Sequence, residues 1–190
     1  MGDIYKKSRN FVINSFTRIN KSYSIKHLER TVYWLKKLKP DADEALLISA
    51  IAHDIERAYR KVDMDGKKLE LGYTDKGFFR PHEEIGADII AKFLFEENVD
   101  NKTIERVKML VSRHEEGGNE DQNLLKDADS ISFFENNVKN FLDKHVKLAG
   151  KEKVKEKLDW MYNRITSDKA KDIVKKWYNN AIQRLENKKY

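Results

Sequence analysis

The chain has 190 residues, of which 38 are Lys or Arg and 32 are Asp or Glu, so its formal net charge is +6. This length suits one domain, or one domain with a modest appendage, and nine Phe, eight Tyr and three Trp supply a substantial core. The absence of cysteine excludes a disulfide scaffold, a thiolate zinc site and a cysteine nucleophile. No apolar run approaches the length of a membrane span, and the start has neither a signal-peptide core nor the serine or threonine that N-myristoylation needs. We therefore expect a cytoplasmic protein with no membrane partner.

Apolar residues recur every three or four positions along most of the chain, which predicts an all-α fold. The first clear helix follows Ser24, a plausible N-cap, and ends at Pro40. The next begins near Asp41 or Asp43, and we expect it to be buried on most sides because residues 45–52 are almost all apolar. Residues 60–80 lack clear periodicity and contain three glycines, so we expect a loop there.

Several further helices are expected after this loop. Pro81 is expected to begin a helix, because proline is favoured at the first helical position. Asp100 or Asn101 caps the following helix, which is expected to end at Glu116 before two glycines. Another helix covers roughly residues 120–135, and three more are expected beyond it.

The positive charge is concentrated at the C-terminal end. Residues 139–190 carry 15 Lys and Arg against 7 Asp and Glu, or +8, whereas residues 1–138 carry 23 against 25, or −2. We therefore expect a helical core over residues 1–138, with basic C-terminal helices, residues 139–190, packed on it. A basic region that contains aromatic residues can bind nucleic acid. We favour solvated helix faces with buried aromatic residues, because acidic residues are interleaved with the lysines.

Histidine is the residue type most suggestive of a functional site. His53 and Asp54 lie at the end of the most apolar helix, where an unpaired buried carboxylate is costly. A metal cation is one natural compensation, because neutral imidazole and carboxylate are both good ligands. Taken alone, a structural pair in which Arg57 neutralises Asp54 is the better explanation. Three other histidines, His27, His82 and His114, also continue apolar stripes, and four such residues can meet only inside a helical bundle.

A further carboxylate candidate lies in the segment LLKDADSISFF. Asp127 and Asp129 are two positions apart and therefore lie on nearly opposite faces of a helix. We expect at most one of them to point inward, and periodicity leaves the choice between them open. His145 lies among charged residues and is expected at the surface.

Over about residues 25–135 the sequence resembles the HD superfamily of metal-dependent phosphohydrolases. The similar stretches are HLERTVYWLKKL, AIAHDIERA, PHEEIGADII and LLKDADSISFF. The resemblance implies an HD-domain helical bundle in which four residues hold one metal: His27, His53, Asp54 and Asp129. It thus selects Asp129 over Asp127. In family members with a second metal, two more histidines complete the site, and here these are His82 and His114.

The metal-ligand types and the resemblance together favour one or two divalent transition metal ions. A site rich in histidine and free of sulfur favours Fe, Mn, Ni, Co or Zn and makes Mg a poorer choice. The expected reaction is hydrolysis of a phosphomonoester or phosphoanhydride, in a small and possibly nucleotide-like substrate, by a metal-activated water. Asp54, Glu83 and Glu115 are the candidate catalytic residues. The candidate phosphate-binding residues are Arg57, Arg60, Lys61, Arg80 and Arg113.

Two other functions remain open from the sequence. A six-ligand HD site that holds two iron ions performs oxygenase chemistry in some family members. Alternatively, the chain is a non-catalytic module whose basic C-terminal region binds nucleic acid or a protein. The sequence lacks the GYP signature of cyclic-dinucleotide phosphodiesterases and a synthetase domain like that of the stringent-response enzymes, so the subfamily and substrate stay open. The oligomeric state is open too.

Overall fold

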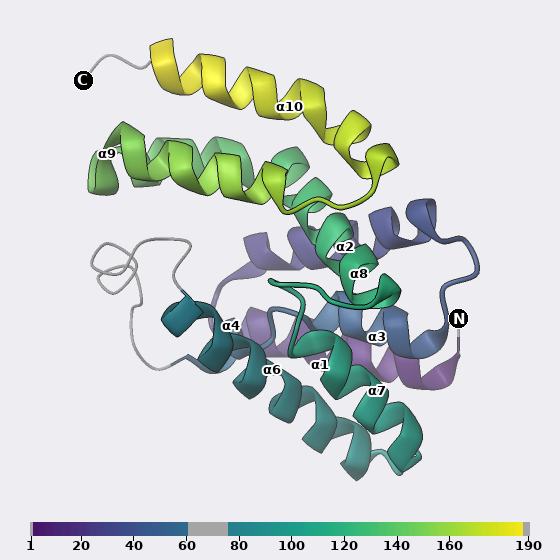
Figure 1. Cartoon of the computed structure of the whole chain (residues 1–190). Helices are drawn as coiled ribbons and strands as arrows, with labels where there is room; N and C mark the ends of the chain where they lie inside the picture. Colours follow the sequence, from purple (N-terminus) through teal and green to yellow (C-terminus); the bar gives the residue numbers. More distant parts are fainter. Residues whose placement is uncertain (1, 61–75, 188–190) are drawn as a thin grey trace.

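The structure, a computed structural model, describes residues 2–60 and 76–187, and within these ranges every regular element is helical (Figure 1). The all-α prediction is confirmed. The elements in chain order are α1 (Asp3–Arg18), α2 (Ser22–Leu38), α3 (Glu44–Ala52), α4 (Glu56–Tyr59), α6 (Lys76–Glu96), α7 (Asn101–Val111), α8 (Glu120–Ser132), the π-helical turn η1 (Phe133–Asn137), α9 (Val138–Asn163) and α10 (Asp168–Asn187).

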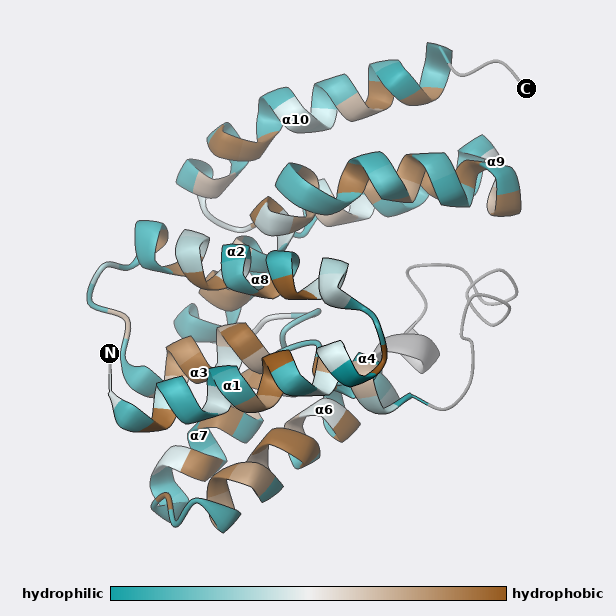
Figure 2. Ribbon diagram, turned by 180° about the vertical axis from the view of Figure 1, so that it is seen from behind, coloured by the Kyte–Doolittle hydropathy of each residue, from teal (hydrophilic) through white to brown (hydrophobic). Residues whose placement is uncertain are grey.

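Helix α3 lies at the centre of the first part of the fold. The Asp43 side chain caps it by accepting a hydrogen bond from the backbone N–H of Leu46, and every residue from 45 to 52 is buried. It packs against α1, α2 and α7, and Figure 2 shows it coloured as hydrophobic along most of its length. The expected burial on most sides is therefore confirmed. A helix buried in this way places whatever follows its last residue inside the protein.

Two apolar clusters build the interior. The first joins α1, α2, α3, α6 and α7 to the first part of α8, and the second begins at Ile131 and joins η1, α9 and α10. Trp34 and Leu38 of α2 pack against both clusters. Figure 1 shows the pair α9–α10 on one side of α2 and α8, with α6 and α7 on the other. Helix α8 therefore has buried neighbours on two sides.

This position of α8 overturns one expectation. Asp127 is 1% exposed and Asp129 is 6% exposed, so both side chains point inward. The prediction that only one can do so is wrong, because it assumed that one face of the helix meets solvent. Helix α8 packs against α2 on one side and against α10 on another, so opposite faces of it are both covered.

The first residues of α2 and α6 differ from the prediction. Helix α2 begins at Ser22, two residues before Ser24. Helix α6 begins at Lys76 and contains Pro81 in its interior, so the expectation that Pro81 begins the helix is wrong. Pro81 is the sixth residue of α6, so it removes one backbone donor, and with it one i→i−4 hydrogen bond, from the interior of the helix. The remaining residues of the expected loop, 61–75, lie outside the described residues.

Helix α7 is shorter than expected. Asp100 caps its start, accepting from the backbone N–H of Thr103, but the helix ends at Val111 rather than at Glu116. The next residues form a tighter turn, in which the N–H of His114 donates to the carbonyl of Val111. The turn matters for the site, because it carries His114.

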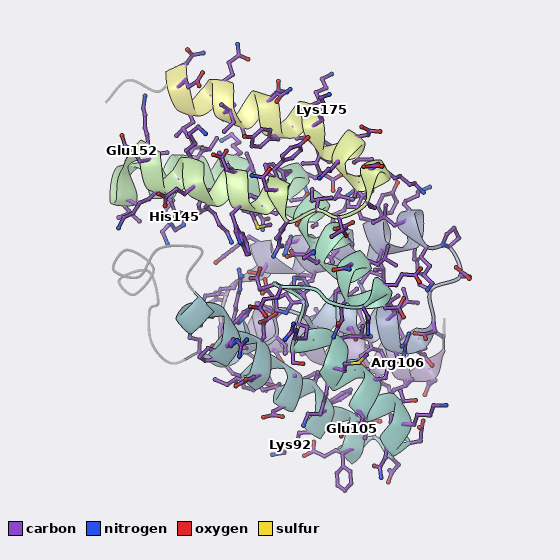
Figure 3. The ribbon with its side chains drawn as sticks, in the orientation of Figure 1. Lys92, Glu105, Arg106, His145, Glu152 and Lys175 are labelled. Atoms are coloured by element: carbon purple, nitrogen blue, oxygen red, sulfur yellow. The ribbon has the colours of Figure 1, made fainter. Side chains whose placement is uncertain are left out.

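The C-terminal part contains the three expected helical segments. Gly150, with φ of 82° and ψ of 168°, interrupts α9 and divides it in two, and α10 follows. Glu135 of η1 accepts hydrogen bonds from Arg30 and Trp34 of α2, which ties this part to the first. Figure 3 shows charged side chains such as Lys92 and Lys175 on the outer helices. Within the described ranges, no helix combines the length and the apolar character needed to cross a bilayer.

Candidate metal centre

Four histidines and two aspartates from five parts of the fold meet inside the bundle. They come from the first half of α2, the two positions after α3, the first half of α6, the turn after α7, and α8. All six are at most 6% exposed: His27, His53, Asp54, His82, His114 and Asp129. The structure thus brings together the whole ligand set expected from the sequence.

The carboxylate of Asp54 lies between two pairs of histidines. Its Oδ2 is 4.0 Å from Nε2 of His27 and 3.7 Å from Nε2 of His53. Its Oδ1 is 2.9 Å from Nε2 of His82 and 3.9 Å from Nε2 of His114. One carboxylate oxygen therefore faces each histidine pair, which is the arrangement of a carboxylate shared by two neighbouring cation positions.

Asp129 adds a second carboxylate to one of the two groups. Its Oδ1 is 3.0 Å from Nε2 of His27 and 3.5 Å from Nε2 of His53. These two histidines with Asp54 and Asp129 offer four ligands on one side of Asp54. On the other side, Asp54, His82 and His114 offer three, and the potential ligand atoms within each set of two histidines and Asp54 lie within 4.8 Å of one another.

Backbone carbonyls orient two of the imidazole rings. Nδ1 of His53 donates to the carbonyl of Ala50 at 2.9 Å, and Nδ1 of His114 donates to the carbonyl of Val111 at 2.8 Å. Because a carbonyl can only accept, each ring carries its proton on Nδ1. In the neutral ring Nε2 then holds a lone pair directed toward Asp54.

Side chains orient the other two rings in the same sense. Nδ1 of His82 donates to Oε2 of Glu56 at 2.8 Å. Nδ1 of His27 lies 2.9 Å from Oγ of Ser132, whose own hydroxyl proton goes to the carbonyl of His27 at 2.8 Å. Ser132 therefore accepts from Nδ1. All four histidines hold Nδ1 with an oxygen partner and present Nε2 inward, as histidine ligands of metals do.

The residues fit a bound cation. Nε2 of His53 and Nε2 of His114 are buried without a hydrogen-bond partner among the described residues. A buried polar atom left without a partner costs free energy, and a metal ion bound to the lone pair removes that cost. Each side of Asp54 contains one of these two atoms. The site can therefore hold a metal ion, and imidazole-rich ligation favours a transition metal over Mg²⁺.

The pKa values of the cluster reflect its crowded charges. Burial opposes charging of His53, but Asp54 and Asp129 raise its pKa to about 9. Burial lowers the pKa of His114 to about 4, and the neighbouring His53 and His82 add to this effect. The pKa values of Asp54 and Asp129 are held well below their usual range, against the effect of burial, by nearby cations and histidines. Both carboxylates are thus ionised and attract positive charge.

Among the candidate phosphate-binding residues, Arg57 lies closest to the ligands. Its Nε is 3.0 Å from Oδ1 of Asp54, and 42% of its side chain is exposed, so it extends from the buried centre to the surface. Arg60 instead holds Glu56, with Nε at 2.9 Å and 3.1 Å from the two carboxylate oxygens, and so supports the partner of His82.

The other three candidates are placed less favourably or lie outside the description. Arg80 and Arg113 both approach Glu116, at 4.0 Å and 3.6 Å, and about half or more of each side chain is exposed. In the described part of the chain, both arginines pair with this carboxylate and with none of the six potential metal ligands. Lys61 lies outside the described residues.

The two candidate glutamates lie on different sides of His114. Glu83 is behind the ring: its Oε1 accepts from the backbone N–H of Glu115 at 2.7 Å and is 3.8 Å from Nδ1 of His114. Burial raises the pKa of Glu83 to about 7. Glu115 is on the ligand side, with Oε1 at 4.0 Å from Nε2 of His114. The geometry therefore places Glu115, and not Glu83, on the side of His114 that faces the potential metal ligands.

Arg164, at the end of α9, contacts the site from the C-terminal part. Its guanidinium donates to Oδ2 of Asp129, to Oε2 of Glu115 and, through Nε at 2.8 Å, to Oγ of Ser130. The Arg164 side chain is 6% exposed. It balances the charge of Glu115, whose pKa falls to about 2 despite burial. By engaging Oδ2 of Asp129, Arg164 leaves Oδ1 directed toward the histidines.

The family described as a domain of unknown function, DUF4202, matches residues 11–185. The chain belongs to this family. No curated protein and no solved structure matches it. The DUF4202 domain thus spans both apolar clusters, including α9 and most of α10.

The sequence did not reveal three supporting residues of this DUF4202 domain. Arg164 and Ser132 meet the site through contacts 35 and 105 positions away, to Asp129 and His27, and no local spacing signals such a contact. Glu56 offered a weak signal, because Glu56 and Arg60 have the i, i+4 spacing of a helical ion pair. That spacing is common on solvated faces and does not indicate a histidine partner.

Proposed function

We propose that this DUF4202 domain is a metal-dependent phosphohydrolase of the HD type, with two transition metal positions that share Asp54. The observation that carries the proposal is the placement of Asp54, whose two carboxylate oxygens each face a different pair of histidine Nε2 atoms. Histidine pairs on both sides of a shared carboxylate suit two neighbouring metal ions, as in many phosphatases.

When bound, such ions lower the pKa of a coordinated water and polarise a phosphoryl oxygen. The chain would supply the remaining requirements. His27, His53 and Asp129 would hold one position, His82 and His114 the other. Arg57 would meet the negative charge of the substrate at the surface end of the site. Glu115 would accept a hydrogen bond near the second position, because its Oε1 faces the ligand side of His114.

The deciding experiment combines metal analysis with an activity screen. Protein purified without chelator is analysed for Mn, Fe, Co, Ni and Zn and then assayed for phosphate release from nucleotides and sugar phosphates. We expect up to two ions per chain and release of phosphate from at least one ester or anhydride. Asp54→Ala should lose both metal and activity. Asp88→Asn, which removes an exposed carboxylate of α6 paired with Lys108, is the matched control and should lose neither.

The same preparation tests the oxygenase alternative. Shared-carboxylate sites with histidine also hold pairs of iron ions, so ligand identity alone does not separate the two reactions. An iron-loaded protein that consumes O₂ with a substrate, and releases phosphate from no ester or anhydride, would refute the hydrolase proposal. The nucleic-acid alternative predicts that Asp54→Ala still binds nucleic acid, with an affinity that falls steeply as the salt concentration rises. If this binding were the protein's function, a non-catalytic role would replace the hydrolase proposal.

A further inference from the structure

Helix α9 presents three residues of one face toward the candidate metal centre. Lys157, Trp160 and Arg164 are spaced by three and four positions and therefore lie on one side of the helix. Arg164 contacts Asp129 and Glu115 directly. The Trp160 ring lies near both cations, 4.0 Å from Nζ of Lys157 and 4.6 Å from the guanidinium carbon of Arg164. This face carries two positive charges to the site from the part of the chain outside the HD-like motifs.

Lys157 lies within the electrostatic field of the centre. Burial lowers its pKa to about 7, Glu115 and Asp129 oppose this change, and Arg164 and Arg57 add to it. Arg57 of α4 is thus among the charges that act on the Lys157 ammonium. Arg57 reaches the same region from α4, through its contact with Asp54. Two cationic side chains from separate elements thus approach the centre together.

Cationic side chains already face the carboxylates of this region in the absence of metal. Asp54, Asp129 and Glu115 interact with Arg57, Lys157 and Arg164, and Asp54 and Asp129 also raise the pKa of His53 to about 9. A divalent ion would therefore add positive charge to carboxylates that these side chains already partly neutralise. Excess positive charge in a partly buried site favours an anionic ligand, and a phosphate dianion matches it better than a neutral molecule.

Arg164 and Arg57 differ in how many of their hydrogen-bond donors are already used within the protein. Arg164 donates to Asp129, Glu115 and Ser130, so binding a ligand would require it to release residues of the site itself. Arg57 uses Nε for Asp54 and keeps 42% of its side chain exposed. A guanidinium has further N–H groups that can donate to an anionic ligand.

We propose that Lys157 of α9 and Arg57 of α4 form a phosphate-binding subsite next to the metal positions, while Arg164 holds the ligands in place. This inference rests on the proposed function and deepens it, because it assigns a substrate-binding role to the C-terminal helices. The substrate group recognised is a terminal phosphate, held between a guanidinium and an ammonium. In this proposal, Lys157 is the basic residue of the C-terminal part that binds the phosphate.

The test measures binding of inorganic phosphate to metal-loaded protein by calorimetry. Lys157→Met and Arg57→Met should each weaken binding by about tenfold or more, the loss typical of one charge-assisted hydrogen bond. Lys155→Met is the matched control, because Lys155 lies on the same helix, carries the same charge and pairs with Asp159 at an exposed position. It should change phosphate affinity by less than about twofold.

Metal content and helicity are measured for every variant. Phosphate binding that falls in Lys157→Met and Arg57→Met at unchanged metal content supports the subsite. Unchanged binding in Lys157→Met, absence of phosphate binding by the parent protein, or loss of metal in parallel with phosphate overturns it. The proposed function fails separately: if no ester or anhydride is hydrolysed while the binding pattern holds, the anion subsite stands and the hydrolase does not.

Discussion

Arg164 shows how a residue distant in sequence can orient a candidate metal ligand. Its guanidinium occupies Oδ2 of Asp129 and leaves Oδ1 to face the histidines. Partners of this kind set the orientation and basicity of a ligand, and their loss typically weakens metal binding by about 10- to 100-fold. We therefore predict a loss of that size in Arg164→Met, measured by competition with a chelating indicator.

The control for this prediction is another arginine that joins the two parts of the fold. Arg30 of α2 makes a two-pronged contact with Glu135 of η1 and touches none of the six ligands. Arg30→Met should lower stability but change metal affinity by less than about threefold. Equal losses of affinity in both variants would show that Arg164 acts only through general stability, whereas partial rescue by Arg164→Lys would support a positioning role.

Glu56 gives the metal-free protein a defined dependence on pH. Burial opposes its ionisation, but His82 and Arg60 lower its pKa from an ordinary 4.5 to about 2. A lowered folded-state pKa contributes stability above about pH 4.5, and that contribution is lost as the pH falls toward 2. The unfolding free energy should therefore drop more steeply between pH 5 and pH 3 in the parent chain than in Glu56→Gln.

Urea titrations of chelator-treated protein at several pH values measure this difference. Glu105→Gln, at an exposed position of α7 labelled in Figure 3, is the control and should follow the parent chain. A Glu56→Gln protein with the same steepness as the parent would contradict the prediction.

At the scale of single elements, Gly150 marks the interruption in α9. Its φ of 82° and ψ of 168° lie in a region that side-chain-bearing residues avoid. Gly150→Ala should therefore lower the unfolding free energy by about 1–3 kcal/mol in urea titrations. The expected cost comes from the backbone, because the nearest atom to an added Cβ is a Glu152 carboxylate oxygen 3.6 Å away.

Gly86 is the matched control because it lies inside α6 with ordinary helical geometry. An added Cβ there would be 3.5 Å from the carbonyl oxygen of His53 and 3.7 Å from its next neighbours, which is normal contact. Alanine is favoured over glycine in a helix interior by about 0.5–1 kcal/mol, so Gly86→Ala should be neutral or stabilising. A stabilising effect of Gly150→Ala would show that α9 can become continuous.

The elements also show what the sequence could and could not predict. Periodicity and capping residues predicted most of the helices after residue 24, and Asp43 and Asp100 cap their helices by direct hydrogen bonds. They did not predict α1, which precedes the first expected helix. His27, His82 and His114 were found because each continues an apolar stripe, and His53 was found because it lies at the end of the most apolar helix. The end of α7 was missed because its apolar pattern continues into the turn that carries His114. The inward placement of Asp127 was missed because periodicity cannot show that opposite faces of one helix are covered.

Asp127 illustrates that limit in chemical terms. Its carboxylate accepts from the backbone N–H groups of Thr166 and Ser167 at 2.8 Å and 2.9 Å, at the start of α10. Two residues later in the same helix, Asp129 faces the histidines. Residue type is identical at both positions, so only the contacts made by distant segments distinguish an anchor of α10 from a candidate metal ligand.

At the scale of the whole molecule, we expect the C-terminal part to be needed by the candidate metal centre. A chain that ends at residue 138 would lose Arg164 and uncover Ile131, Phe133 and Phe134, which pack against α9 and α10. Without Arg164, Asp129 and Glu115 would lack their shared partner. Burying unpaired charge is costly, so we predict that residues 1–138 alone aggregate or fail to bind metal.

The prediction is tested by expressing this shortened chain and, for comparison, a chain that ends at Asn187. Solubility, helicity and metal content are compared under the same conditions. A shortened chain that stays soluble and binds metal with the affinity of the longer one would show that the first apolar cluster suffices.

Helix α8 has a consequence for how this fold tolerates change. Six of its polar residues are buried, and each has a defined partner: Gln122, Lys126, Asp127, Asp129, Ser130 and Ser132. Hydropathy would place α8 at the surface and α3 in the interior, yet both are interior helices. In α3 one aliphatic residue can often replace another. In α8 each buried polar side chain instead needs a hydrogen bond to a particular donor or acceptor. Substitutions that preserve size but not hydrogen-bonding capacity should therefore be accepted far less readily in α8 than in α3.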